Sequence, residues 1–143
     1  SNQYPNHIGT FLRYDYGLAH KIFGGADVLL VPSRYEPCGL NQLYALKYGA
    51  VPIVTATGGL TDTVEEYEAE SNAGTGFKFY PPTPSELEKA VSKAIRLYRE
   101  QPDFWMRLMI RGMKKDYSWN RSAREYLKLY NRAIADRKAF IGS

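Results

Sequence analysis

The sequence contains a single cysteine, Cys38, and only two histidines among its 143 residues. One cysteine excludes an internal disulfide, and Cys38 has neither a second thiol nor a histidine pair beside it, so we expect no metal site. Long apolar runs are also missing. None approaches the ~20 residues of a membrane-spanning helix, and the amino terminus lacks the basic and apolar regions of a secretory signal. We therefore expect a protein that is not exported and has no membrane partner.

Acidic and basic residues are unevenly distributed along the chain. Residues 1–83 contain five Lys and Arg against eight Asp and Glu, a net charge of −3, whereas residues 84–143 contain fourteen against seven, a net charge of +7. The basic residues alternate with acidic and apolar ones at helical spacing, and no nucleic-acid-binding motif accompanies them. This pattern favours a solvated helix face over a nucleic-acid surface, so no nucleic acid is expected as a partner.

The most informative stretch is PSRYEPCGL, residues 32–40. Residues 27–31 before it, which are apolar after Asp27 and include two β-branched valines, predict a strand buried on both faces. Residues 41–48 after it predict a helix that ends at Gly49. A loop between the carboxyl end of a strand and the start of a helix binds anions, because free backbone N–H groups face the ligand there. The groups expected to do so belong to Cys38, Gly39, Leu40 and Asn41.

A second glycine loop follows the next predicted strand. Residues 51–56 are apolar and β-branched, and residues 57–62 (TGGLTD) place two glycines where the backbone can approach a ligand closely. Two such loops at one edge of a sheet predict a single cleft.

The remaining patterns complete an α/β order. Strands are predicted over residues 7–12 and 77–80, a mobile surface loop over residues 71–76, and helices over 14–23, 84–98, 104–115 and from Ser118 onward. Strands and helices in this order predict parallel strands joined by right-handed crossovers, that is, a partial doubly wound, Rossmann-like sheet followed by carboxyl-terminal helices. Because a complete domain of this kind has about six strands, we infer that the chain is part of a longer protein.

Several motifs together resemble the carboxyl-terminal part of bacterial glycogen synthases and plant starch synthases. They are Tyr14-Asp15 and residues 32–42, 47–49, 57–64 and 117–119. The resemblance implies a retaining glucosyltransferase with two Rossmann-like domains, which moves glucose from ADP-glucose to the 4-hydroxyl of an α-1,4-glucan without a metal or other cofactor. Related transferases have a second Glu eight residues after the Glu of this loop. Here that position is Tyr44, which argues against the sucrose- and trehalose-type relatives.

The resemblance also implies which parts lie outside this chain. The family meets the donor phosphates with an Arg and a Lys earlier in the same domain, and its amino-terminal domain supplies a Lys-Gly-Gly loop and a His. We therefore expect residues 1–101 to form a nucleotide-sugar-binding half-domain and residues 102–143 to form helices that pack on it and towards the missing amino-terminal domain. The chain alone is not expected to catalyse transfer.

By resemblance, Glu36 is the catalytic residue, because its carboxylate opposes positive charge that develops at the anomeric carbon. The alternative is a surface ion pair with Arg34. Gly39 and Leu40 would donate backbone hydrogen bonds to phosphate or glucose, or simply start a helix. Cys38 would serve through its small size and its N–H group.

Two further features have a functional and an ordinary interpretation. Tyr14 would stack on the adenine or pack in the ordinary way. The turn at Thr57 would contact sugar or phosphate or be only a tight turn, and His20 is expected to be structural. The expected ADP-glucose-binding set is Tyr14, Glu36, Cys38, Gly39, Leu40, Asn41, Thr57, Gly58 and Gly59.

Other functions compete with that of a transferase fragment. A non-catalytic nucleotide- or glucan-binding module would keep the same loops, and a flavodoxin-like regulator would share the phosphate-binding geometry by coincidence. We expect a cytoplasmic location in a bacterium, or the plastid stroma in a plant. The last helix has a wide apolar stripe, so self-association is also expected; the stripe consists of Trp119, Ala123, Tyr126, Leu127, Tyr130 and Ile134.

Overall fold

Three short parallel strands form the centre of the computed structural model, which describes residues 3–141. The strands are β1 (Val28–Val31), β2 (Val51–Thr55) and β3 (Phe77–Phe79), in the order β1-β2-β3. Leu30 pairs with Ile53, and Ile53 pairs with Phe77. The predicted parallel α/β sheet is therefore confirmed, and all five residues of β2 are buried, as expected of a central strand.

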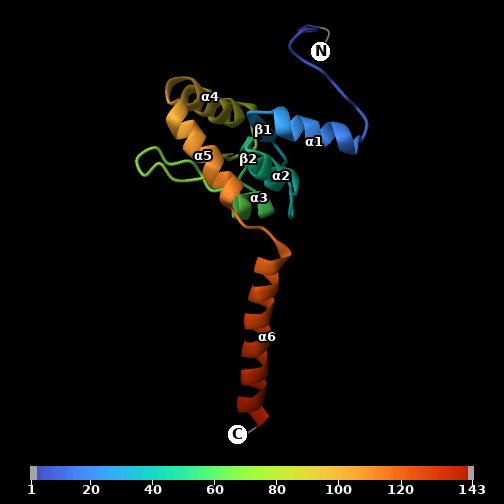
Figure 1. Ribbon diagram of the computed structural model, residues 1–143, viewed down its shortest axis with the longest axis vertical. Helices are drawn as coiled ribbons and strands as arrows, with labels where there is room; N and C mark the ends of the chain where they lie inside the picture. The colour runs from blue at the N-terminus through green and yellow to red at the C-terminus, as the bar shows by residue number, and fades with distance from the viewer. Residues whose placement is uncertain (1–2, 142–143) are drawn as a thin grey trace.

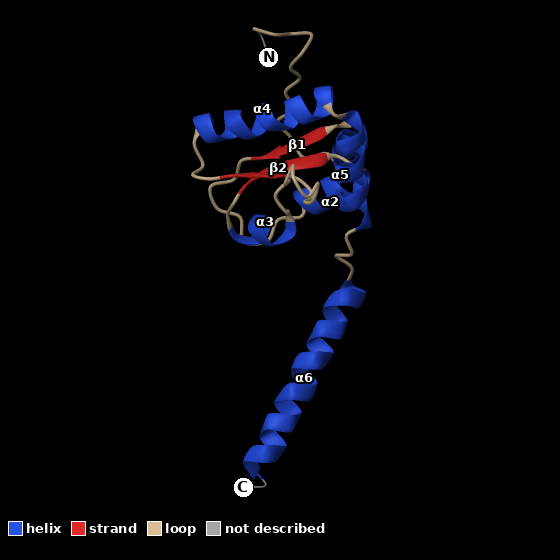
Figure 2. Ribbon diagram, turned by 90° about the vertical axis from the view of Figure 1, so that its left-hand side faces the viewer, coloured by secondary structure: helices blue, strands red, loops and turns tan. Residues whose placement is uncertain are grey.

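Helices connect and cover the strands (Figures 1 and 2). Asp15 caps the first by accepting a hydrogen bond from the N–H of Leu18 at 2.9 Å, and Gly49 ends the second in the left-handed conformation, at φ 87°. The helices are α1 (Tyr16–Gly25), α2 (Asn41–Tyr48), α3 (Gly58–Thr63), α4 (Pro84–Glu100), α5 (Pro102–Lys114) and α6 (Trp119–Ile141).

Side chains alternate between two core clusters, one on each face of the sheet. Ile53 and Phe77 face the larger cluster, which contains residues of α4 and α5, whereas Val54 faces the smaller cluster with Leu60 of α3. Figure 2 shows α4 and α3 on opposite sides of the strands. Neighbouring residues of β2 thus pack on opposite helices, which explains why this strand has no polar face.

The predicted strand over residues 7–12 is wrong. These residues are irregular and exposed, and β1 has no neighbour on its outer side among the described residues. A strand persists only when its backbone groups pair and one face is buried. Ile8 and Leu12 have no such partner surface here, so the local β pattern alone does not form a strand.

Two predicted loops are also wrong. Residues 58–63 form the short helix α3 rather than an open loop as far as Asp62. Residues 74–76 are buried, not part of a surface loop, and the hydroxyl of Thr75 accepts a hydrogen bond from the N–H of Glu65 at 3.0 Å. Local composition does not reveal this tertiary partner, which brings the small residues inside.

The last helix leaves the body of the molecule. None of the described residues of α6 is buried, and Trp119 is 85% exposed. Figure 1 shows α6 projecting away from the sheet, whereas α5 packs against α2 and α4. How the chain divides into domains remains a prediction. No described helix is both long and apolar enough to span a bilayer.

Replacement of a core residue of α5 tests whether this helix belongs to the body. Leu108 is 0% exposed and lies in the larger cluster, so Leu108→Ala should lower the free energy of unfolding by about 2–5 kcal/mol. The matched control is Ile110→Ala on the exposed side of α5, expected to cost about 1 kcal/mol or less. Urea unfolding measures both, and equal losses would contradict the packing described here.

The apolar stripe of α6 should make the chain self-associate. Tyr126, Leu127 and Tyr130 are all more than half exposed, and burying apolar surface contributes about 25 cal/mol per Å². Sedimentation velocity should show dimers or larger species as the concentration rises. Leu127→Glu should shift the population towards monomer, whereas Arg132→Glu, on the face of α6 opposite the stripe, should not. A strict monomer at all concentrations would disprove this expectation.

Candidate functional site

The loops that follow β1 and β2 touch each other through their backbones. The N–H of Gly59 donates to the carbonyl oxygens of Glu36 and Pro37, at 3.1 Å and 3.2 Å. Because β1 and β2 are neighbours, their carboxyl ends lie at one edge of the sheet, where ligands bind in α/β folds. The two loops therefore meet at one place, and the single cleft expected between them stays a prediction.

Glycine is required at both positions of contact. A Cβ on Gly58 would collide with the carbonyl oxygen of Glu36, and a Cβ on Gly59 would collide with the carbonyl of Cys38 and lie within 2.7 Å of its Cα. Gly58 also has a positive φ of 44°. The glycines therefore allow one loop backbone to lie directly on the other.

The predicted backbone donors are unpaired. In the described part of the chain, no acceptor bonds the N–H groups of residues 38–41, which form the turn into α2. Gly39 has a φ of 71°, so the chain reverses sharply here without a Cβ. Unpaired N–H groups at a helix start carry partial positive charge, and this geometry suits a phosphate or another anionic oxygen.

Glu36 is half-buried beside this turn, and its backbone holds Gly59. No ion pair joins its carboxylate to Arg34 within the described residues, so the structure does not support the ion-pair alternative. The carboxylate remains available to a ligand.

Tyr14 and His20 occupy different environments near α1. Tyr14 is 88% exposed immediately before Asp15, so ordinary packing does not account for its ring. His20 is on α1 and faces α2, where its Nδ1 is 2.9 Å from the hydroxyl of Tyr48 and its ring lies near that of Tyr44. This environment agrees with the structural role expected for His20.

Thr57 precedes the first turn of α3, and its side chain makes no capping bond. Its carbonyl accepts from the N–H of Leu60 at 3.1 Å, so the turn at residues 57–59 is also a helix start. The site therefore combines two helix starts, one from each loop.

Sequence reasoning missed Gln42, which is 0% exposed on α2. Its Nε2 lies 3.1 Å from the carbonyl oxygen of Cys38, 3.0 Å from that of Gly39 and 3.1 Å from the hydroxyl of Thr63. The available signal was positional, since Gln42, Ala45 and Leu46 have the spacing of one buried helix face. A polar residue at such a position requires buried partners.

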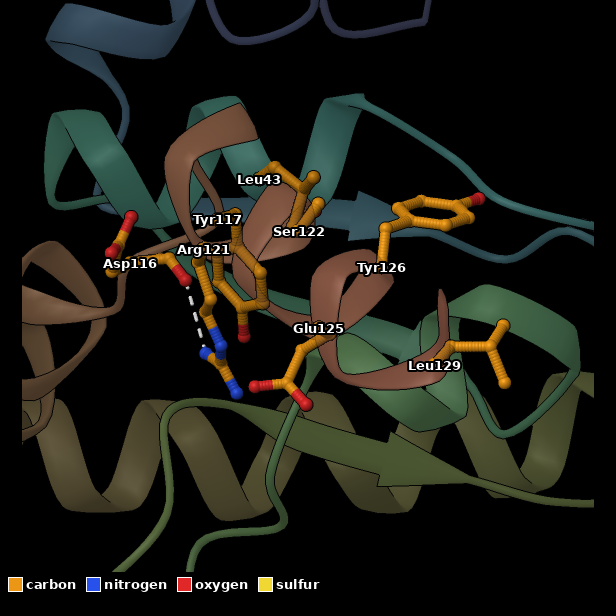
Figure 3. Close-up of a pocket in the computed structure, with 8 residues that line it drawn as sticks. All are labelled: Leu43, Asp116, Tyr117, Arg121, Ser122, Glu125, Tyr126 and Leu129. Carbon is orange, nitrogen blue, oxygen red and sulfur yellow. Dashed lines mark hydrogen bonds between the residues drawn. The ribbon is translucent and has the colours of Figure 1, made fainter. Parts of the chain in front are cut away.

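Three cavities lie near the candidate site. One of about 380 Å³ lies where β1 ends, between α1 and the start of α2, and Ser33 and Asn41 contribute its polar lining. A second, about 460 Å³, includes Leu40 and lies between α2 and the residues before α6. The largest of the three, about 510 Å³, lies between Leu43 of α2 and the first turns of α6 (Figure 3). All three volumes are in the range of small-molecule sites, but the largest cavity includes no residue of the predicted loops.

Polar groups at the 510 Å³ cavity bond to neighbouring backbone and side chains. Tyr117 donates from its hydroxyl to the carbonyl of Thr63 at 2.6 Å, and burial, followed by the nearby charge of Glu65, raises the pKa of Tyr117. Hydrogen bonds from Ser118 lower the pKa of Asp116. In Figure 3 Arg121 bonds the backbone of Asp116. These contacts fix the segment between α5 and α6 to the end of α3.

The described residues contain no group of three or more His, Cys, Asp or Glu side chains placed to hold a metal ion.

Comparison with known proteins identifies a family. The family model described as "Glycosyl transferases group 1" matches residues 2–105. Glycogen synthase from Thermotoga petrophila is 49% identical over 133 residues, and that from Koribacter versatilis is 50% identical over the same length. Each alignment covers 93% of this chain and 27% of the relative, so the chain spans about a quarter of the length of these curated proteins.

Solved structures agree with this result. The catalytic domain of starch synthase IV from Arabidopsis thaliana, bound to ADP and acarbose, is similar with a TM-score of 0.83 and 34% identity, over 93% of this chain and 28% of that one. Sucrose-phosphate synthase from Thermosynechococcus elongatus is similar with a TM-score of 0.68 and 25% identity, over 94% and 32%. The starch synthase is the more similar of these two.

The contact between the loops predicts the effect of one methyl group. Gly59→Ala should lower the free energy of unfolding by about 1–3 kcal/mol, because the new Cβ meets backbone atoms that must move. The control is Gly25→Ala at the end of α1, where a Cβ meets nothing within 4 Å and is expected to be neutral or to stabilise slightly. Urea unfolding measures the stability of both variants. A Gly59→Ala chain with an unchanged free energy of unfolding would contradict the close contact.

Proposed function

Since this chain belongs to the group 1 glycosyl transferases, we propose that it is the donor-binding carboxyl-terminal part of a glycogen or starch synthase. The whole enzyme would transfer glucose from ADP-glucose to the 4-hydroxyl end of an α-1,4-glucan with retention of configuration. The relatives named glycogen synthase and the starch synthase solved with ADP and acarbose support this assignment.

One observation carries the assignment to residues. The hydrogen bonds from Gly59 to Glu36 and Pro37 bring both glycine loops to a single edge of the sheet. There, the unpaired N–H groups of residues 38–41 and a half-buried carboxylate lie together. Anion donors beside a carboxylate suit a sugar diphosphate, because the phosphate is negative and the anomeric carbon becomes positive during transfer.

Each residue then has a role in the proposal. Glu36 opposes the positive charge at the anomeric carbon, and the N–H groups of residues 38–41 bind phosphate or glucose oxygens. Residues 57–59 contact the sugar or phosphate from the second loop. The exposed ring of Tyr14 stacks on the adenine. The proposal includes no metal or other cofactor.

The proposed enzyme needs more than this chain. The chain spans about a quarter of its relatives, and we propose that an amino-terminal domain supplies the acceptor side and further cationic groups for the diphosphate. A bacterial cytoplasm is the proposed location, as the glycogen synthase relatives come from bacteria.

Replacement of the carboxylate tests the proposal in a hybrid enzyme. The hybrid is the Thermotoga petrophila glycogen synthase in which this chain replaces the matching region. Glu36→Gln should lower kcat on the order of 10²–10³-fold with little change in KM for ADP-glucose, because the charge acts mainly in the transition state. Glu70→Gln, an exposed acid on another loop, is the control. An unchanged kcat for Glu36→Gln would refute the catalytic role.

The 143-residue chain alone should bind ADP or ADP-glucose weakly. Backbone N–H groups at helix starts contribute modestly, whereas charge-assisted bonds from Arg and Lys are about twice as strong, and the proposal places those outside this chain. Isothermal titration calorimetry should give a dissociation constant well above the micromolar range. A micromolar or tighter value would show that the two loops suffice for binding.

A further inference from the structure

Gln42, which is fully buried, connects the two loops of the proposed site through hydrogen bonds. Its Nε2 is within hydrogen-bond distance of three acceptors, the carbonyl oxygens of Cys38 and Gly39 and the hydroxyl of Thr63. The hydroxyl of Thr63 donates its own hydrogen to the carbonyl of Gly59 at 2.6 Å, so towards Gln42 it acts as an acceptor. A continuous chain of hydrogen bonds thus runs from the first loop, through two side chains, to the second.

The amide orientation of Gln42 follows from these partners. Every group around Nε2 is an acceptor, so only the nitrogen fits there, and Oε1 points to the other side. Oε1 is buried and has no hydrogen-bond partner. A buried acceptor without a partner is destabilising, and methionine would fill the space without one. Packing alone therefore does not explain a glutamine at this position.

The consequence for the site lies in the geometry of the peptide bond. The carbonyl of one residue and the N–H of the next share a trans peptide plane and point in opposite directions. The Cys38–Gly39 and Gly39–Leu40 peptides are both trans. By holding the carbonyls of Cys38 and Gly39 towards the interior, Gln42 directs the N–H groups of Gly39 and Leu40 outward. These are among the unpaired donors of the candidate site.

We propose that Gln42 is a positioning residue for donor binding, which aims the N–H groups of Gly39 and Leu40 at an anionic oxygen of the sugar diphosphate. Thr63 supports it by tying Gln42 to the second loop. The inference rests on the proposed function for the identity of the ligand. The hydrogen-bond chain itself does not depend on that function, and the two can be tested separately.

The first test needs no ligand. The N–H of Gly59 bonds across to Glu36 and Pro37, so its hydrogen exchange reports whether the loops stay together. In the 143-residue chain, Gln42→Met and Thr63→Val should speed the exchange of this amide about tenfold, because local opening becomes easier. Thr63→Ser keeps the hydroxyl and should restore slow exchange. The control is Thr75→Val, which removes a hydroxyl at a 1% exposed position that bonds the N–H of Glu65 and neither loop.

The second test uses the hybrid enzyme and separates positioning from general loss of structure. Misdirected N–H groups weaken binding of the donor, so Gln42→Met should raise KM for ADP-glucose about tenfold, the effect of losing one to two hydrogen bonds. KM for the glucan should stay constant. A merely structural role would lower the active fraction, and hence kcat, at unchanged KM. Thr75→Val should at most lower kcat, with KM for ADP-glucose unchanged.

The outcomes distinguish the two ideas. Exchange at Gly59 that is equal in Gln42→Met and Thr75→Val would overturn the positioning role, whatever the enzyme does. Faster exchange with an unchanged KM for ADP-glucose would overturn the link to donor binding. A hybrid with no glucosyl transfer from ADP-glucose would refute the proposed function, while the exchange comparison would still decide whether Gln42 positions the loops.

Discussion

The direct contact of two backbones, residues 36–38 lying on residues 58–59, is the constraint on which the site depends. No side chain separates them, because a Cβ at either glycine would occupy the space of a carbonyl group. The contact sets the separation of the two loops more strictly than side-chain packing would. Packed side chains can adjust by changing rotamer, whereas two backbones in direct contact have no side chain between them that could do so. Adjacent parallel strands bring the loops to one edge, and the glycines allow them to close.

The two helices that start at these loops, α2 and α3, pack against different parts of the molecule. α2 is held against α5, where Gly112 comes so close to Leu46 that a Cβ there would lie 2.8 Å from its Cδ2. α3 packs under β2 through Leu60 and receives the hydroxyl of Tyr117 at its end. The site loops are thus supported by regular structure on two sides, which favours a preorganised ligand site over an adaptable one.

The sequence predicted the parallel sheet and placed both glycine loops at one sheet edge, because both depend on local patterns: apolar strands, glycine turns and a glycine helix end. The prediction failed where a residue distant in sequence determines the local structure. Residues 7–12 have a β pattern but no neighbouring strand, and residues 74–76 look like a surface loop but are drawn inside by Thr75. Gln42 was missed for a related reason. Its amide matters through Thr63, twenty-one residues away in sequence, and no local pattern contains that pair.

The projecting α6 has a mechanical consequence. A helix of 23 residues is about 35 Å long, since each residue adds 1.5 Å. In the described part of the chain, bonds from Lys115 and Tyr117 tie the start of α6 to the body, and a rotation of about 10° there would displace the far end by about 6 Å. The hydroxyl of Tyr117 donates to the carbonyl of Thr63. The side-chain hydroxyl of the same threonine accepts from Gln42. A small rotation at the end of α3 would therefore be magnified at the tip of α6.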